Sequence, residues 1–134
     1  MSITTVILRW VYGLFYTYVG ASWFIHKIIG RPWVTPPEPP QAKAITSAFA
    51  ASGVVDPLIA ATCLAGGLLL LVRRTTPLGI AILAPLVTGI FLFHVFLTGG
   101  WVWGTIHFVL LAALAWLHRS AFRSLWSFGA AGAA

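Results

Sequence analysis

Residues 77–97 read PLGIAILAPLVTGIFLFHVFL and contain no Asp, Glu, Lys or Arg. An apolar run of about 20 residues is what a helix needs to cross a lipid bilayer. Proline suits the start of such a helix because the first turn does not use its missing N–H. Gly99 and Gly100 then end the run. We therefore predict a transmembrane helix over 77–97, kinked near its middle by Pro85.

The composition of the whole chain points the same way. Of the 134 residues, 60% are hydrophobic and 7% are charged, whereas a soluble domain has about 25% charged residues. A soluble core of this length could not bury so much apolar surface, so we expect a single domain whose solvent is lipid. The single cysteine, Cys63, excludes an intrachain disulfide.

Three further apolar runs predict three more transmembrane helices, at about 4–29, 54–72 and 101–118. The predicted fold is thus all-α, a four-transmembrane-helix bundle over residues 1–126 with a flexible tail at 127–134. The glycines and alanines of the first two spans (Gly13, Gly20, Ala21 and Ala65–Gly67) are expected to let helices approach closely.

A proline-rich stretch at 31–40 separates the first two spans and predicts an extended connection. After it, residues 41–52 predict a short interfacial helix that stops at Gly53. Asp56–Pro57 and Thr76–Pro77 are each typical of a helix N-cap followed by proline at the first helical position.

The charges predict the orientation. In a four-span protein both termini share a side with the second loop, and that side carries Arg9, Arg73, Arg74, Arg119 and Arg123. The other side carries three basic residues (Lys27, Arg31 and Lys43) and both acids (Glu38 and Asp56). The excess predicts a multi-pass protein of a bacterial-type inner membrane with cytoplasmic termini. Basic residues at span ends suit lipid headgroups and argue against nucleic acid as a partner.

Histidines are the candidate site residues, because ionisable groups at membrane depth are costly. His118 reads as interfacial, whereas His26, His94 and His107 all fall in the outer third of the predicted membrane. His107 lies roughly 9 Å along its helix axis from the outer end. These three could serve as a proton relay, contact a quinone headgroup or ligate haem b. Alternatively, each simply bonds a backbone carbonyl or hydroxyl. A histidine cluster could also bind copper or zinc, but no His-x-x-His or Glu-x-x-His spacing supports a metal site, and we name no metal ligand or catalytic residue.

The chain resembles the DoxX-like family of small four-helix membrane proteins. The resemblance rests on Pro77–Gly79 with LAPLVTGIFLFHVFL (83–97), on SGVVDPLIAATCLAGGLLLLVRR (52–74) and on AWLHRSAFRSL (115–125). It implies that His94, in the pair Phe93–His94, is the family's histidine. Family members often carry a glutamate in the second helix where this chain has Cys63. The resemblance implies partnerships with membrane redox systems, including quinone oxidation and thiol or oxidative-stress systems.

We therefore expect an accessory or redox-associated subunit of a larger membrane complex, without catalytic activity of its own. Its expected partners are the bilayer and other integral membrane proteins. An independent membrane oxidoreductase, or a quinone- or haem-binding protein using the outer histidines, is the alternative. A small transporter or lipid-handling module is a third possibility, although no internal repeat supports it.

Overall fold

The computed structural model describes residues 2–33 and 36–126, and within them every regular element is a helix. This confirms the all-α class. The expected flexible tail at 127–134 lies outside the described residues. The elements in order are α1 (Ile3–Ile28), α2 (Pro40–Ser52), α3 (Val55–Leu71), α4 (Thr76–Phe93), the π-helix η1 (His94–Thr98), α5 (Trp101–Leu117), the 3-10 helix η2 (Arg119–Phe122) and α6 (Arg123–Trp126).

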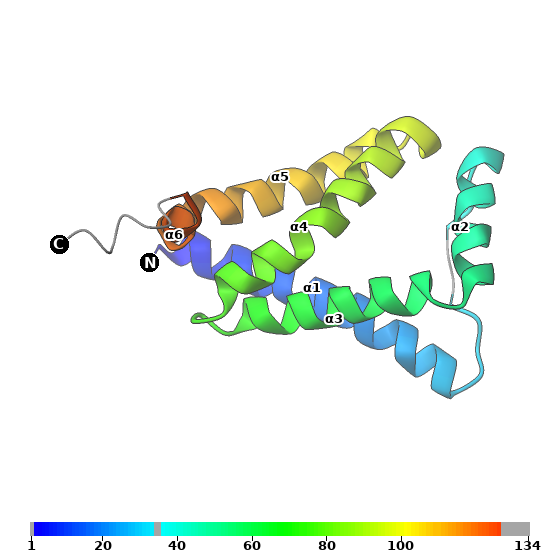
Figure 1. Cartoon of the computed structure of the whole chain (residues 1–134), viewed down its shortest axis with the longest axis horizontal. Coiled ribbons are helices and arrows are strands. Elements are labelled where there is room, and N and C mark those ends of the chain that lie inside the picture. Colours follow the sequence, from blue (N-terminus) through cyan, green and yellow to red (C-terminus); the bar gives the residue numbers. More distant parts are fainter. Residues whose placement is uncertain (1, 34–35, 127–134) are drawn as a thin grey trace.

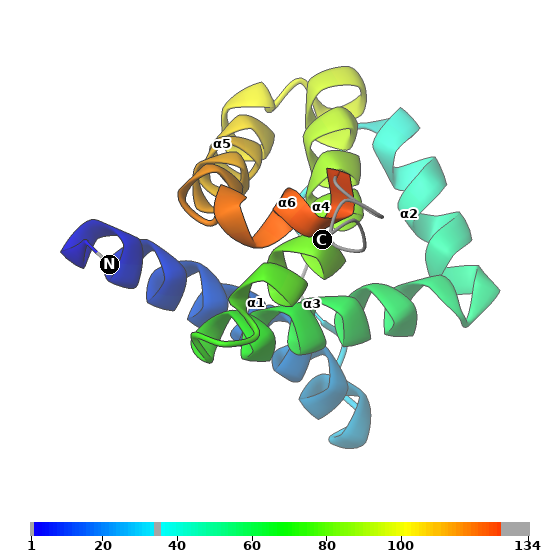
Figure 2. The ribbon, with the colours of Figure 1, turned by 60° about the vertical axis from the view of Figure 1, so that its left-hand side comes forward.

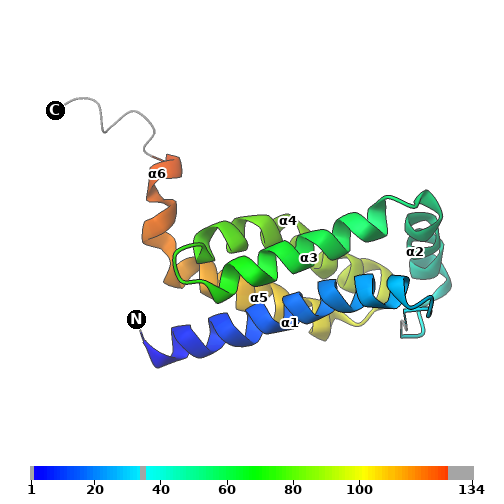
Figure 3. The same cartoon turned by 90° about the horizontal axis from the view of Figure 1, so that it is seen from below.

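Four long helices form the body of the molecule (Figure 1). α1 packs against α3, α3 against α4 and α4 against α5, and α5 returns to α1. Figure 3 shows α1 and α3 side by side along the length of the body. α2 stands across one end of it, turned by 91° from α3. The N-terminus and α6 lie at the opposite end, which faces forward in Figure 2.

The core lies where these four helices meet. Its buried members are Tyr12, Tyr16, Cys63, Leu70, Ile80, Leu83, Val87, Leu111 and Leu114. The outer faces of the same helices expose large apolar side chains, among them Ile7, Leu58, Leu92 and Val109. Pro85 is exposed, and α4 continues through it without a break.

Glycines set the close approach of α1 to α3, as predicted. A methyl group on Gly20 would lie 2.5 Å from the Ala60 carbonyl oxygen and the Leu64 backbone nitrogen. On the facing helix, a methyl group on Gly67 would collide with the backbone nitrogen of Thr17. Only residues without a side chain allow the two backbones to come this near. Of the other predicted small residues, Ala65 is exposed and takes no part.

The predicted helix starts need correction. α3 begins at Val55, so Asp56 lies inside its first turn and makes no capping bond. The Ser52 hydroxyl instead accepts hydrogen bonds from the backbone N–H groups of Val54 (3.3 Å) and Val55 (3.1 Å). Because α2 ends immediately before α3, a side chain from the end of one helix can serve the start of the next. Thr76 is likewise the first residue of α4 and not its cap.

One other sequence expectation holds at this end of the molecule. Gly53 ends α2 in the left-handed conformation, with φ of 68°. α2 covers the end of the bundle, where the Gln41 side chain donates a hydrogen bond to the Leu97 carbonyl at 3.0 Å.

One described helix, the 23 residues of α4 and η1 from Thr76 to Thr98, is by itself long and apolar enough to cross a membrane. α2 and α3 pass the same test only when taken together as one bent segment. α5 is apolar but shorter, at 17 residues. The prediction of a membrane protein is therefore supported by one helix that passes this test by itself, and the test does not establish four spans.

Candidate functional site

His107, on α5, is the most deeply buried of the three predicted histidines, with 6% of its surface exposed. Its ring nitrogen Nδ1 lies 3.1 Å from the hydroxyl of Tyr16 on α1. One turn earlier on α1, the hydroxyl of Tyr12 donates to the backbone carbonyl of His107 at 2.8 Å. Two tyrosines thus hold one histidine between α1 and α5.

Aromatic rings enclose the His107 side chain. The centroid of its ring lies 4.6 Å from Trp103 and 5.0 Å from Phe15. Such packing fixes the ring orientation and keeps water away from the Tyr16–His107 pair. The direction of this hydrogen bond depends on the tautomer of the ring, because Nδ1 either accepts a hydrogen bond from the phenolic hydroxyl or donates its own N–H to the phenolic oxygen.

Cys63, on α3, belongs to the same buried core as Tyr12 and Tyr16 and is 2% exposed. It is the only cysteine of the chain. Cys63 thus shares the core with the two tyrosines. The resemblance to the DoxX-like family implies that this position often carries a glutamate in that family. An uncharged thiol there suits an apolar interior, where a carboxylate would need a partner.

His94 is half-buried and opens the π-helix η1. Its Nδ1 lies 2.8 Å from the Ile90 carbonyl oxygen. A carbonyl only accepts, so Nδ1 must carry the proton, and the neutral ring keeps a lone pair on Nε2. That lone pair has no hydrogen-bond donor among the described residues.

The structure brings His94 and His107 onto touching helices. A methyl group on Gly104, one turn before His107, would lie 2.9 Å from the Cβ atom of His94. His26 stands apart, on α1 ten residues beyond Tyr16 and so about 15 Å further along the axis. Its Nδ1 is buried and has no hydrogen-bond partner among the described residues. The three predicted residues therefore do not form one site.

The described residues do not fit a haem between His94 and His107. Two axial histidines must stand on opposite faces of a porphyrin, but α4 and α5 are in contact one turn away from His107. Two surface cavities, one of about 520 Å³ at the N-terminal end and one of about 160 Å³ between α4 and α5, are not lined by His26, His94 or His107. A quinone headgroup needs only one hydrogen-bonding side chain, and Nε2 of His94 is an acceptor that could serve it.

Sequence reasoning missed Tyr12, Tyr16 and Arg9. All three lie on the inward face of α1 with Thr5, and each is at most 6% exposed. The signal was present, since positions 5, 9, 12 and 16 recur with helical spacing and each bears a polar atom. It was hidden because α1 has seven aromatic residues, and their spacing alone does not single out Tyr12 and Tyr16.

No protein-family model matches the sequence, and no curated protein or solved structure matches it either.

Proposed function

We propose that this chain is a four-span membrane protein of the DoxX-like type and serves as an accessory, redox-associated subunit of a larger membrane complex. The placement in lipid is supported by the segment from Thr76 to Thr98. In the most apolar 18-residue stretch of this segment, 17% of the residues are buried within the structure. The core helix of a soluble protein would be mostly buried, so these apolar side chains face a medium other than water.

The lengths of the other long helices suit the same bilayer, although α1 is less apolar than the segment from Thr76 to Thr98 and is not by itself a candidate span. α1 has 26 residues, which gives about 39 Å of helix. α3 and α5 have 17 residues each, or about 26 Å, slightly less than the roughly 30 Å of a hydrocarbon core. Exposed Val54 and Val72 extend the apolar length of α3 at both ends. A shortfall of a few ångströms is met by local thinning of the bilayer.

The ends of the molecule differ in charge, which supports cytoplasmic termini. Arg73 and Arg74 lie at the end that carries the N-terminus, together with Arg119 and Arg123. Both acids, Glu38 and Asp56, lie at the end covered by α2. A basic end without carboxylates belongs on the cytoplasmic side under the positive-inside rule.

The observation that carries the subunit role is the outer face of α1. Ile7, Val11, Leu14, Tyr18 and Ile25 are all more than half exposed. Their positions follow a repeat of four and three residues, with Ala21 completing the series, which is the pattern of a seam between packed helices. Tyr18 is 72% exposed and its hydroxyl has no partner among the described residues. Lipid tails cannot bond this hydroxyl, whereas a helix of another membrane protein can.

The redox association is supported by the resemblance and by the interior of the bundle. Cys63, Tyr12, Tyr16 and His107 gather polar and oxidisable atoms at one level of an otherwise apolar core. Both tyrosines bond His107, and none of the four residues lines the cavity at the N-terminal end or the one between α4 and α5. Their arrangement suits a subunit that supports a partner's chemistry better than an enzyme with its own substrate pocket.

Site-specific photocrosslinking tests this proposal. A photoreactive benzoylphenylalanine replaces Tyr18 in one variant and Leu68, an exposed residue of α3, in the control. We expect irradiation of whole membranes to join the Tyr18 variant to one integral membrane protein that also co-purifies with the unmodified chain. The Leu68 variant should give lipid adducts only. Crosslinks of the Tyr18 variant confined to a second copy of the chain, or to no protein, would contradict the subunit role.

A second candidate, a quinone-binding protein, is favoured by one observation, the lone pair on Nε2 of His94. A neutral imidazole of this kind accepts a hydrogen bond from a quinol hydroxyl and can take its proton. His94→Ala should then abolish quinone-dependent turnover in membranes that contain the chain. Phe96→Ala, which changes an exposed side chain of the same turn, is the control. Equal turnover in the two variants removes His94 from the mechanism.

A further inference from the structure

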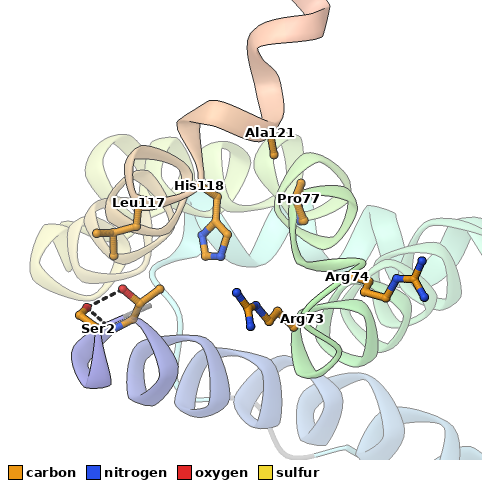
Figure 4. Close-up of a pocket in the computed structure, with 8 residues that line it drawn as sticks. Ser2, Arg73, Arg74, Pro77, Leu117, His118 and Ala121 are labelled. Atoms are coloured by element: carbon orange, nitrogen blue, oxygen red, sulfur yellow. Dashed lines mark hydrogen bonds between the residues drawn. The ribbon is translucent and has the colours of Figure 1, made fainter.

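A cavity of about 520 Å³ opens at the end of the bundle opposite α2. Three separate parts of the chain line it. Ser2 and Thr5 come from the start of α1. Arg73 and Arg74 come from the connection between α3 and α4, and Pro77 from the first turn of α4. Leu117, His118 and Ala121 come from the end of α5 and from η2. Figure 4 shows the His118 ring and the Arg73 side chain pointing into the space between these elements, with Arg74 turned away.

The cavity gathers positive charge without a counter-ion from the part of the chain that the structure describes. Every Asp and Glu of the sequence lies elsewhere, because Glu38 precedes α2 and Asp56 is in the first turn of α3. Among the described residues, no carboxylate lines the cavity. Cationic side chains that share a concave surface repel one another, and an anion between them relieves that repulsion.

Hydrogen-bond donors are available beside the charges. The Ser2 and Thr5 hydroxyl oxygens lie 2.8 Å apart and share one proton. One of the two hydroxyls therefore keeps an O–H that is free to donate. His118 donates Nδ1–H to the Leu114 carbonyl oxygen at 2.9 Å. Its Nε2 becomes a second donor when the ring is protonated. Arg73 adds a planar guanidinium, a group suited to bidentate contacts with phosphate oxygens.

Arg9 is an independent indication of the same chemistry. It lies one turn beyond Thr5 on the same face of α1 and is 6% exposed. Its Nε and Nη1 atoms are buried and have no hydrogen-bond partner among the described residues. Long side chains of a helix lean toward its N-terminus, which in α1 is the end that carries the cavity. A buried guanidinium without a partner is costly unless an anion reaches it.

We propose that this cavity binds a phosphate group that has no positive charge attached to it, held by Arg73, His118 and the Ser2–Thr5 hydroxyls. Arg9 lies one helical turn beyond Thr5 on α1. Two sources can supply such a group. One is the headgroup of an anionic lipid, since the cavity lies at the ends of the long helices. The other is a soluble phosphate compound. The proposal does not depend on the subunit role, because no residue that lines the cavity belongs to the exposed face of α1 that carries that role.

The test uses the purified chain in neutral detergent, with native mass spectrometry and titration calorimetry as readouts. We expect the wild-type chain to retain phosphatidylglycerol in preference to zwitterionic phosphatidylcholine. Arg73→Gln should weaken this binding about tenfold or more, the size expected for a lost charge-assisted contact. Lys43→Gln, which removes a positive charge from exposed α2, should bind like the wild type, and Arg74→Gln should have a smaller effect than Arg73→Gln.

Inorganic phosphate distinguishes the two sources. If millimolar phosphate binds in calorimetry and displaces phosphatidylglycerol, the natural ligand is a soluble phosphate compound. If phosphatidylglycerol binds and phosphate does not displace it, the ligand is a lipid headgroup. Circular dichroism spectra that match the wild type ensure that a loss of binding is not a loss of folding. Equal binding by wild type, Arg73→Gln, His118→Ala and Lys43→Gln would overturn the proposal.

Discussion

The hydroxyl of Tyr16 lies 3.1 Å from Nδ1 of His107, and this contact joins α1 to α5 across 91 positions of the sequence. Both residues are buried. α1 and α5 are the first and last long helices, so they close the ring in which the other helices pack in sequence order. A polar bond at this closing contact favours one register of α1 against α5, because an apolar interior offers few other partners to either atom.

Tyr16→Phe should destabilise the fold by about 1–3 kcal/mol. The ring still fills its place in the core, but Nδ1 of His107 loses its partner, and a buried polar atom without a hydrogen bond carries a cost of this size. Chemical unfolding in detergent, followed by circular dichroism, measures the change. Tyr18→Phe is the matched control, because it removes the same hydroxyl from a residue that is 72% exposed. Equal effects of the two substitutions would show that the Tyr16–His107 bond contributes nothing specific.

Gly20→Ala should destabilise the packing of α1 on α3 by at least about 1–3 kcal/mol, the usual cost of overpacking a tight contact. The new methyl group would meet backbone atoms of Ala60 and Leu64 at 2.5 Å. Backbone cannot rotate away as a flexible side chain can, so the helices must separate. Gly89→Ala, on α4, is the control, because nothing lies within 4 Å of its added methyl group. The same unfolding experiment should show Gly89→Ala to be neutral or slightly stabilising, since alanine is the better helix former.

The corrected start of α3 leads to a third prediction. Ser52→Ala should cost about 1 kcal/mol, as is typical for the loss of a helix cap. Two backbone N–H groups, of Val54 and Val55, then lose their acceptor. Asp56→Asn should change the free energy of unfolding by less than about 1 kcal/mol, because only its charge near the helix start is lost. A larger effect for Asp56→Asn than for Ser52→Ala would restore the capping role to Asp56.

The helices were predictable because their signals are local. Apolar length, prolines at the starts and glycines at the ends all act within one helix, so the expected ranges match α1 to α5 closely. The cap of α3 was misplaced because Ser52 belongs to the preceding helix. Its role depends on how sharply the chain turns at Gly53, which the residues around Asp56 do not reveal.

The site was less predictable because it depends on pairing between distant helices. The burial of His107 follows from which face of α1 meets α5, and the spacing within α5 does not contain that information. Likewise, the sequence places His26 and His94 at similar depths in the predicted membrane. It does not say whether the two residues lie on the same side of the bundle. Arg9 was counted as a loop charge, although the helix continues through it and turns it inward.

The proposed four-span topology predicts opposite exposure of the two ends of the molecule. Ala44→Cys, on α2, and Ser120→Cys, on η2, place a thiol at exposed positions and leave every charge in place. In a Cys63→Ala background each variant has a single reactive thiol. A maleimide that cannot cross membranes should label Ala44→Cys in intact cells, and Ser120→Cys only after the membrane is opened. The physical reason is the excess of arginine around Ser120, which is retained on the cytoplasmic side. The reverse pattern would invert the orientation, and labelling of both variants from one side would exclude an arrangement in which the bundle separates the two ends.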